Sequence, residues 1–192
     1  MQELKERIVK EGKVLPGNII KVDGFLNHRI DTELMTHIAE EFGKHFNMDE
    51  VTMILTAEAS GIALSAIVAQ HFHKPMIFAK KAKSDNIEGG LYQSDIFSYT
   101  YKKKVTLLVS KEWLSADDKV LIIDDFMANG EAMRGLCDIV TAAGATLVGI
   151  GCAVEKGFQG GGDRLRAAGV NLKSLAIIES AEPGNIVFRG ED

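Results

Sequence analysis

The sequence of 192 residues contains little cysteine and no long apolar run. Its two cysteines, Cys137 and Cys152, can form neither a disulfide framework nor a four-ligand metal site, and they suit a reducing compartment. No uninterrupted apolar stretch approaches the roughly 18 residues that a transmembrane helix needs. The charged N-terminus has no apolar signal core. We therefore expect a soluble cytoplasmic protein without a membrane partner.

Basic residues are also in the minority. The 22 lysines and arginines face 27 acidic residues, which gives a formal net charge of −5. Proteins that bind nucleic acid nonspecifically usually carry a basic face, so this balance disfavours a nucleic-acid partner. With 46% apolar and 26% charged residues, the composition is typical of a globular protein with a proper core. The length predicts a single domain over residues 1–192.

Apolar periodicity in the sequence predicts an α/β fold. Four segments predict helices. Apolar residues recur with helical spacing in 31–46 and 131–143, whereas 2–11 is a short charged segment and 62–71 is mostly apolar. Six short apolar runs predict strands at 51–56, 76–80, 105–110, 120–125, 147–154 and 175–178. Strands that alternate with helices are typical of right-handed βαβ units. The pattern therefore predicts a mostly parallel, twisted sheet flanked by helices on both faces.

One long polar segment, residues 81–104, interrupts this alternation. It contains two consecutive glycines at 89–90 and is bounded by lysines. A structureless loop of this length in a compact domain is usually functional, whereas the strand-like residues at 91–101 also suit a β-hairpin. We expect a flexible hairpin or lid here.

The most informative segment is the strand at 120–125, which ends in Asp124 and Asp125. Ligands of open α/β sheets bind at the carboxyl ends of the strands, and small residues at 128–130 lead from this strand into the next helix. Backbone N–H groups in such a turn, together with the helix N-terminus, favour phosphate. The carboxylates would repel phosphate, so they suit ribose hydroxyls or the waters around Mg²⁺. A plain turn with a helix cap is the alternative interpretation.

Other phosphate-binding and metal-binding motifs are missing from the sequence. Residues 12–18 have the glycine spacing of a P-loop, but Asn18 stands where lysine is required. Residues 149–154 carry two of the three glycines of a dinucleotide-binding fingerprint, and they lie inside a strand. The histidines show no metal-ligand spacing, so no residue is predicted to ligate a metal directly.

The strand, the acidic pair and the turn together resemble the motif with which type I phosphoribosyltransferases bind 5-phosphoribosyl 1-pyrophosphate (PRPP). In that family, two acidic residues are followed by three variable residues, Thr-Gly and a small or hydroxylated residue. Here Asn129 replaces the threonine and Ala132 the last residue, and asparagine keeps a donor and tolerates turn geometry. Residues 21–31 and 151–159 resemble the family members that use xanthine. The resemblance covers nearly the whole chain and implies the type I phosphoribosyltransferase fold, with residues 1–30 contributing to a base-binding hood.

The resemblance implies a pentosyltransferase reaction of purine salvage. The 5-phosphoribosyl group of PRPP passes to xanthine, which yields xanthosine 5′-monophosphate and pyrophosphate. Asp124 and Asp125 would hold the ribose hydroxyls and shape the shell of a Mg²⁺ ion that PRPP and water mainly bind. The other implied PRPP-binding residues are Ala128, Asn129, Gly130, Glu131, Ala132, Glu58, Ala59, Ser60, Gly61 and Lys81. The turn at 58–61 also reads as an ordinary strand-to-helix connection. A homodimer is implied as well.

The xanthine-binding residues implied by the resemblance are Ile20, Asn27, Lys156 and Phe158. The Lys156 ammonium can donate a hydrogen bond to a 6-oxo group, and it would reject the 6-amino group of adenine. Two interpretations without a role in base binding stay open. Lys156 could be a surface lysine, and Phe158 is as readily a core residue as a stacking partner for the purine.

One position of the motif departs from the relatives that use hypoxanthine and guanine. Ala128 stands where those relatives carry an acidic residue that can take the proton from the base. Xanthine is unusually acidic for a purine, and we hypothesise that its own acidity replaces this carboxylate. Asp85, Glu88 and Asp95 of the long polar segment are the alternative proton acceptors.

Two other functions compete with transfer to xanthine. The first is transfer to another purine base, against which Lys156 (for adenine) and Ala128 (for hypoxanthine and guanine) argue. The second is a PRPP-sensing transcriptional regulator built on the same fold. Such a regulator needs a DNA-binding domain and a basic face, whereas the chain is acidic and only a short segment precedes the matched region.

Overall fold

The computed structural model describes residues 1–81, 90–98 and 103–190. Its main sheet has six strands in the order β10-β9-β8-β7-β3-β4. These are β3 (Met53–Ala57), β4 (Met76–Ala79), β7 (Lys119–Met127), β8 (Thr146–Lys156), β9 (Leu172–Glu182) and β10 (Asn185–Phe188). All neighbouring strands are parallel except β9 and β10. The prediction of a mostly parallel sheet is confirmed.

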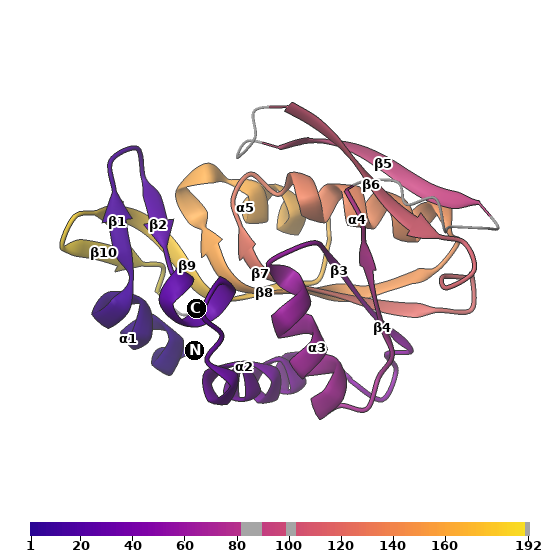
Figure 1. The fold of residues 1–192 in the computed structure, drawn as a ribbon, viewed down its shortest axis with the longest axis horizontal. Coiled ribbons are helices and arrows are strands. Elements are labelled where there is room, and N and C mark those ends of the chain that lie inside the picture. Colours follow the sequence, from indigo (N-terminus) through magenta and orange to yellow (C-terminus); the bar gives the residue numbers. More distant parts are fainter. Residues whose placement is uncertain (82–89, 99–102, 191–192) are drawn as a thin grey trace.

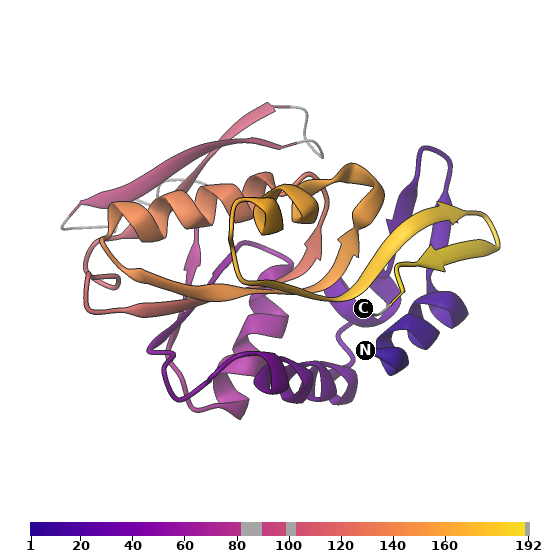
Figure 2. The same cartoon turned by 180° about the vertical axis from the view of Figure 1, so that it is seen from behind.

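Helices cover both faces of this sheet (Figure 1; Figure 2 shows it from behind). One face carries α2 (Thr32–His45) and α3 (Gly61–His71), and the other carries α4 (Glu131–Ala142) and α5 (Gly161–Ala167). Because successive side chains of a strand point to opposite faces, Leu121 and Ile123 of β7 join the core beneath α2 and α3. Val120 and Ile122 join the core beneath α4. None of the described helices has the length and apolar character that crossing a bilayer requires.

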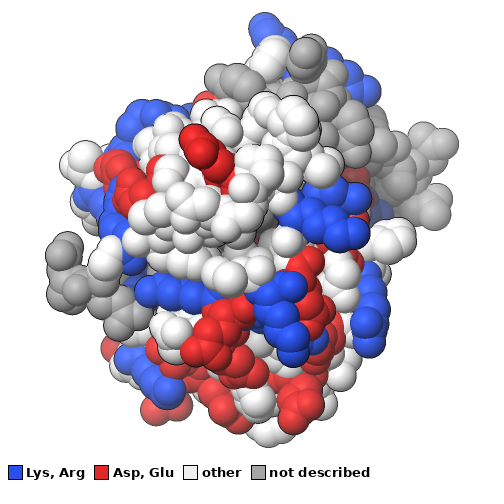
Figure 3. Space-filling view, turned by 90° about the vertical axis from the view of Figure 1, so that its left-hand side faces the viewer, with Lys and Arg blue, Asp and Glu red and all other residues white. Residues whose placement is uncertain are grey.

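The N-terminal residues 1–30, which we call the hood, stand at one end of the sheet beside β9 and β10 (Figure 1). The hood consists of α1 (Gln2–Glu11), the hairpin of β1 (Lys13–Leu15) and β2 (Ile19–Lys21), and the short π-helix η1 (Asp23–Asn27). The Met1 amino group donates to the Leu175 carbonyl at 2.6 Å. The Arg7 guanidinium bonds the carboxylate of Asp31, the N-cap of α2. On this end of the molecule, acidic and basic side chains are interspersed (Figure 3).

A second hairpin, formed by β5 (Leu91–Ser98) and β6 (Lys103–Ser110), lies across α4 on the far side from the main sheet (Figures 1 and 2). Our prediction that residues 105–110 belong to the parallel sheet was therefore wrong. They pair antiparallel with β5, and a Cβ on Gly135 of α4 would lie 2.5 Å from Ile96 Cγ2. The strand-like residues predicted from 91 onward do form β5, but its hairpin partner lies mostly beyond residue 104, outside the predicted segment. Residues 82–89 and 99–102, which include Asp85 and Glu88, lie outside the described residues.

Three further differences from the prediction affect the site. Strand β7 continues through Phe126 and Met127, so the turn that follows it begins at Ala128 rather than at Phe126. Strand β8 reaches Lys156, where Glu155 still pairs with Met127 of β7. The sequence prediction also missed α5 and β10.

Candidate active site

The carboxyl ends of β3 and β7 open into a cleft of about 260 Å³, the place where open α/β sheets bind ligands. Nine of its lining residues belong to the predicted PRPP set, namely Glu58, Ser60, Lys81, Asp124, Ala128, Asn129, Gly130, Glu131 and Ala132. Ile96 and Phe97 of β5 close one side of the cleft. The structure therefore brings together side chains from four separate segments of the chain.

The turn between β7 and α4 has the geometry of an anion cradle. Gly130 precedes α4 with a φ of 77°, a left-handed conformation that glycine adopts without strain. The free N–H groups of the first turn of α4 follow directly, and they carry the positive end of the helix dipole. This arrangement of backbone donors suits a phosphate group.

Helix α5 supports this turn from behind. A Cβ on Gly161 would lie 2.4 Å from the Ala128 carbonyl oxygen and 2.7 Å from the Gly130 nitrogen, so only glycine fits there. The Arg164 guanidinium donates to the Asn129 carbonyl at 2.9 Å. Sequence reasoning missed this contribution, although three consecutive glycines at 160–162 were a signal of close backbone packing.

Asp124 is 6% exposed and faces the cleft. Burial and the nearby Asp125 carboxylate raise the pKa of Asp124 well above its usual range, while Lys81 acts in the opposite direction. The Asp125 backbone N–H donates to Asp124 Oδ1 at 3.0 Å. A Cβ on Gly61 would lie 2.2 Å from that oxygen. Gly61 therefore leaves the room that the Asp124 carboxylate occupies.

Asp125 leaves the strand on the opposite side and is 1% exposed. Its Oδ2 accepts a hydrogen bond from Asn27 Nδ2 at 3.0 Å, and its Oδ1 accepts one from Ser60 Oγ at 2.8 Å. Asp125 is not among the residues that line the cleft. The two neighbouring aspartates thus have different surroundings, since Asp124 lines the cleft and Asp125 lies between the hood and the β3–α3 turn.

Lys156 is the last residue of β8 and lies under the hood. Its ammonium donates to the Asn18 carbonyl at 3.1 Å and lies 5.4 Å from the centre of the Phe126 ring. Burial lowers the pKa of Lys156. This half-buried position beside an aromatic face differs from that of an ordinary surface lysine.

The remaining predicted base-binding residues surround the same region. Ile20 of β2 is buried in the core beneath the hood, and Phe158, in the short 3-10 helix η2 (Gly157–Gln159), packs against that core. Phe158 is half-buried there, and its role as a stacking partner for the purine stays a prediction. Among the alternative proton acceptors, Asp95 accepts a hydrogen bond from Thr106 Oγ1 at 2.7 Å.

A buried ion pair lies next to Lys156, and sequence reasoning missed it. Glu155 is fully buried and pairs with Arg166 of α5 at 2.6 Å, and Ser174 Oγ also donates to it. A Cβ on Gly162 would lie 2.0 Å from Glu155 Oε1, so this glycine makes room for the carboxylate. The ion pair fixes α5 to the end of β8, and α5 in turn supports the turn between β7 and α4.

The chain is similar to known proteins along its whole length. The phosphoribosyl transferase domain model matches residues 25–168. The chain is 53% identical over 193 residues to a xanthine phosphoribosyltransferase of Lachnoclostridium phytofermentans, and the match covers 100% of both chains. It is 53% identical over 192 residues to that of Bifidobacterium longum, covering 98% of this chain and 100% of the relative.

Solved structures show the same fold at low sequence identity. The adenine phosphoribosyltransferase of Giardia lamblia complexed with 9-deazaadenine has a TM-score of 0.76 and 20% identity, over 93% of this chain and 98% of that one. The enzyme of Saccharomyces cerevisiae has a TM-score of 0.75 and 19% identity, over 91% and 97%. The domain match and the full-length relatives go further than the fold, and the chain belongs to the phosphoribosyltransferase family.

Proposed function

We propose that the protein transfers the 5-phosphoribosyl group of PRPP to xanthine, releasing pyrophosphate and forming xanthosine 5′-monophosphate for purine salvage. The observation that carries this proposal is 53% identity along the whole chain to xanthine phosphoribosyltransferases. The cleft beside Asp124 and the half-buried Lys156 support it. The free thiols of Cys137 and Cys152 suit a reducing compartment, which supports action in the cytoplasm.

The reaction breaks the bond between ribose C1 and the pyrophosphate oxygen and forms a bond from C1 to a ring nitrogen of the base. Positive charge gathers on the ribose, so the protein must position the reactants and stabilise charge. The turn at 128–132 would hold the 5′-phosphate through its backbone N–H groups and the Asn129 side chain. Asp124 faces the cleft and would hold the ribose hydroxyls and stabilise the cationic sugar. Glu58, Ala59, Ser60, Gly61 and Lys81 would meet the pyrophosphate.

The donor set at the cleft fits Mg²⁺, which prefers hard oxygen ligands and keeps several waters. Asp124 offers its carboxylate to the cleft, and a nearby cation would offset the repulsion that raises the pKa of Asp124. Asp124, with Asp125 next to it in the strand, would shape the shell of an ion bound mainly by PRPP and water. When bound, Mg²⁺ would neutralise charge on the diphosphate group.

The base would lie under the hood, between Lys156 and Asn27. Lys156 would donate to the 6-oxo group and favour the xanthine anion, and Asn27 would meet the edge that carries the 2-oxo group. Ile20 and Phe158 would contribute packing. Ala128 offers no general base. Xanthine would therefore release its proton to solvent, either before or during the transfer of the phosphoribosyl group.

Pyrophosphate release with PRPP and Mg²⁺ should be measured with xanthine, hypoxanthine, guanine and adenine in parallel. We expect the highest kcat/KM with xanthine and the lowest with adenine, since the Lys156 donor has no acceptor on a 6-amino group. A preference for another base would keep the fold and the PRPP site but would overturn the assignment of the base pocket. PRPP binding without turnover of any base would favour the regulator function.

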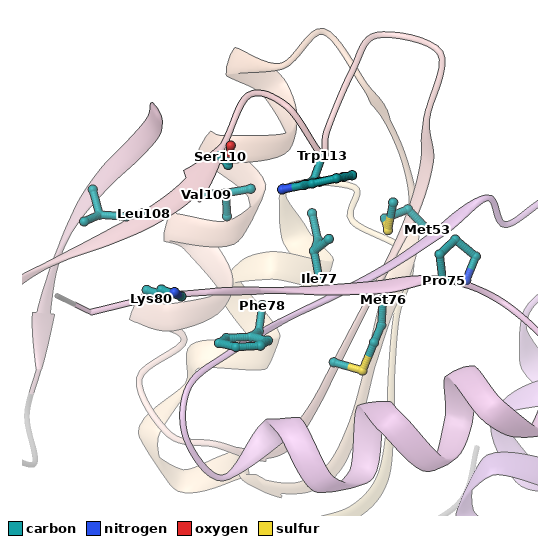
Figure 4. A pocket seen from close by; sticks show the side chains of 10 residues that line it. All are labelled: Met53, Pro75, Met76, Ile77, Phe78, Lys80, Leu108, Val109, Ser110 and Trp113. Atoms are coloured by element: carbon teal, nitrogen blue, oxygen red, sulfur yellow. The ribbon is translucent and has the colours of Figure 1, made fainter. Parts of the chain in front are cut away.

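We also propose that the protein is a homodimer that associates through the edge of the sheet at β4. A groove of about 610 Å³ there is lined mainly by apolar side chains from β3, β4, β6 and the segment after it (Figure 4). Trp113, which is 60% exposed, and Phe78 lie at this groove. Exposed apolar patches of this kind often mark protein interfaces.

The variant Trp113→Glu tests this interface. We expect sedimentation velocity to show a dimer for the wild type and a shift to monomer for the variant, because a buried unpaired charge at the interface costs several kcal/mol. Val9→Glu, at an equally exposed apolar position on α1, is the matched control and should stay dimeric. A wild-type monomer would contradict the homodimer, and a dimeric Trp113→Glu would contradict the surface.

A further inference from the structure

The Asp125 carboxylate joins two segments that lie far apart in the sequence. Asn27 lies 98 residues before it and ends the π-helix of the hood. Ser60 lies 65 residues before it, in the turn between β3 and α3. Each segment supplies one donor, and each donor bonds a different carboxylate oxygen. Both oxygens of this carboxylate are therefore hydrogen-bonded within the protein.

These two donors occupy both carboxylate oxygens of Asp125, and one of them, Ser60, also lines the cleft. The carboxylate is 1% exposed and does not contribute to the cleft lining, whereas Ser60 and Asp124 do. A ribose hydroxyl therefore cannot reach Asp125 in this arrangement unless one donor moves. Because ribose is the part of PRPP that carboxylates recognise, this closure bears on PRPP binding.

The two donors belong to different parts of the fold. Ser60 is the residue before α3, between a central strand and a helix whose Ser65 also bonds the β7 backbone at 3.0 Å. Asn27 ends a five-residue π-helix, an element that is rare and mostly occurs as a local irregularity at functional sites. The chain leaves that helix at once, through His28 with a ψ of −63°. Asn27 is thus the donor that belongs to the hood, and Ser60 is the donor that belongs to the turn after β3.

We propose that the hydrogen bond from Asn27 to Asp125 is a latch between the hood and the sheet, and that PRPP must open it. The ribose hydroxyl takes the place of Asn27 Nδ2 at Asp125 Oδ2, while Ser60 keeps its bond to Oδ1. The released Asn27 carboxamide is then free to meet the base. Ser60 acts as a positioning residue that holds the carboxylate in both states. This inference rests on the proposed function.

Two alanine variants that each remove one donor from the same carboxylate test the latch. PRPP binding with Mg²⁺ and without base is measured by calorimetry for the wild type, Asn27→Ala and Ser60→Ala. Asn27→Ala removes the competitor of the ribose and should tighten PRPP binding about 2- to 10-fold, the equivalent of one net hydrogen bond. Ser60→Ala removes a donor that the bound state keeps, so it should weaken PRPP binding.

The direction in which Asn27→Ala changes the affinity for PRPP decides whether Asn27 competes with the ribose for Asp125. If Asn27 merely holds Asp125 in place, its removal should weaken PRPP binding, as expected for Ser60→Ala. That result, with an active wild type, would overturn the latch alone. Failure of the wild type to bind PRPP would overturn the proposed function together with the latch. Asn27→Ser, whose side chain is too short to bridge the same span, repeats the test if the alanine variant does not fold.

Discussion

Replacing Lys156 by methionine should lower kcat/KM for xanthine about 100-fold while the affinity for PRPP stays near that of the wild type. Methionine keeps the length and apolar stem of the side chain but removes the ammonium. A hydrogen bond from a charged donor contributes about 1.5–3 kcal/mol, and about 2.7 kcal/mol corresponds to a factor of 100. The variant should weaken the interaction with the base and not the binding of PRPP. Lys156 lies under the hood and does not line the cleft at the ends of β3 and β7.

The pH profile separates this role from general destabilisation. Burial lowers the pKa of Lys156. Its ammonium group therefore loses its proton at a lower pH than an ordinary lysine, whose pKa is about 10.4. We expect the alkaline limb of kcat/KM for xanthine to lie in that lowered range and to vanish in Lys156→Met. Lys119→Met, at the exposed start of β7, should leave the profile unchanged. An unaltered alkaline limb in Lys156→Met would remove Lys156 from the base pocket.

Local signals explain why most elements could be predicted from the sequence. The helix predicted over 31–46 is confirmed with Asp31 as its N-cap, since Asp31 Oδ1 accepts the Leu34 N–H at 3.1 Å and α2 begins at the next residue. Strands β7 and β8 are buried on both faces, and their continuous apolar runs show this directly. The topology then explains why the site residues come together. The carboxyl ends of parallel strands lie at one edge of the sheet, so the residues that follow them lie close to one another.

Non-local pairing explains what could not be predicted. The run at 105–110 has the composition of a sheet strand, and only its partner, β5 rather than a central strand, decides where it lies. The Pro183-Gly184 turn before β10 and the glycines at the start of α5 are recognisable breakers, but a breaker does not indicate which element packs after it. Likewise, no local pattern could indicate that Asn27 bonds Asp125 across 98 residues.

Asp124→Asn should lower kcat about 100- to 1,000-fold and yet make the protein more stable. The loss in kcat follows because the variant removes a preorganised charge from beside the cationic ribose, and such single electrostatic groups contribute factors of about 10²–10³. The gain in stability follows because the buried Asp124 carboxylate is desolvated and repelled by Asp125, which raises its pKa. Asparagine keeps the acceptor that the Asp125 N–H uses.

The sign of the stability change depends on pH in a way that can be measured. Between the unfolded-state pKa of about 3.9 and the raised pKa of Asp124, the folded protein binds more protons than the unfolded chain. The free energy of unfolding therefore falls as the pH rises through this window. Asparagine does not titrate, so its advantage should be absent at acid pH and complete above the raised pKa.

Thermal unfolding at several pH values should show this advantage in the Tm. Relief of a strained active-site charge commonly gives about 1 kcal/mol, or about 2–4 °C in Tm for a domain of this size. Asp49→Asn, at an exposed position, should change neither Tm nor turnover. A Tm for Asp124→Asn at or below that of the wild type at neutral pH would contradict the raised pKa. If kcat also stayed unchanged, the cationic ribose would need another source of negative charge. A stability gain with lost turnover would instead show that the fold tolerates an unfavourable buried carboxylate because the reaction requires it.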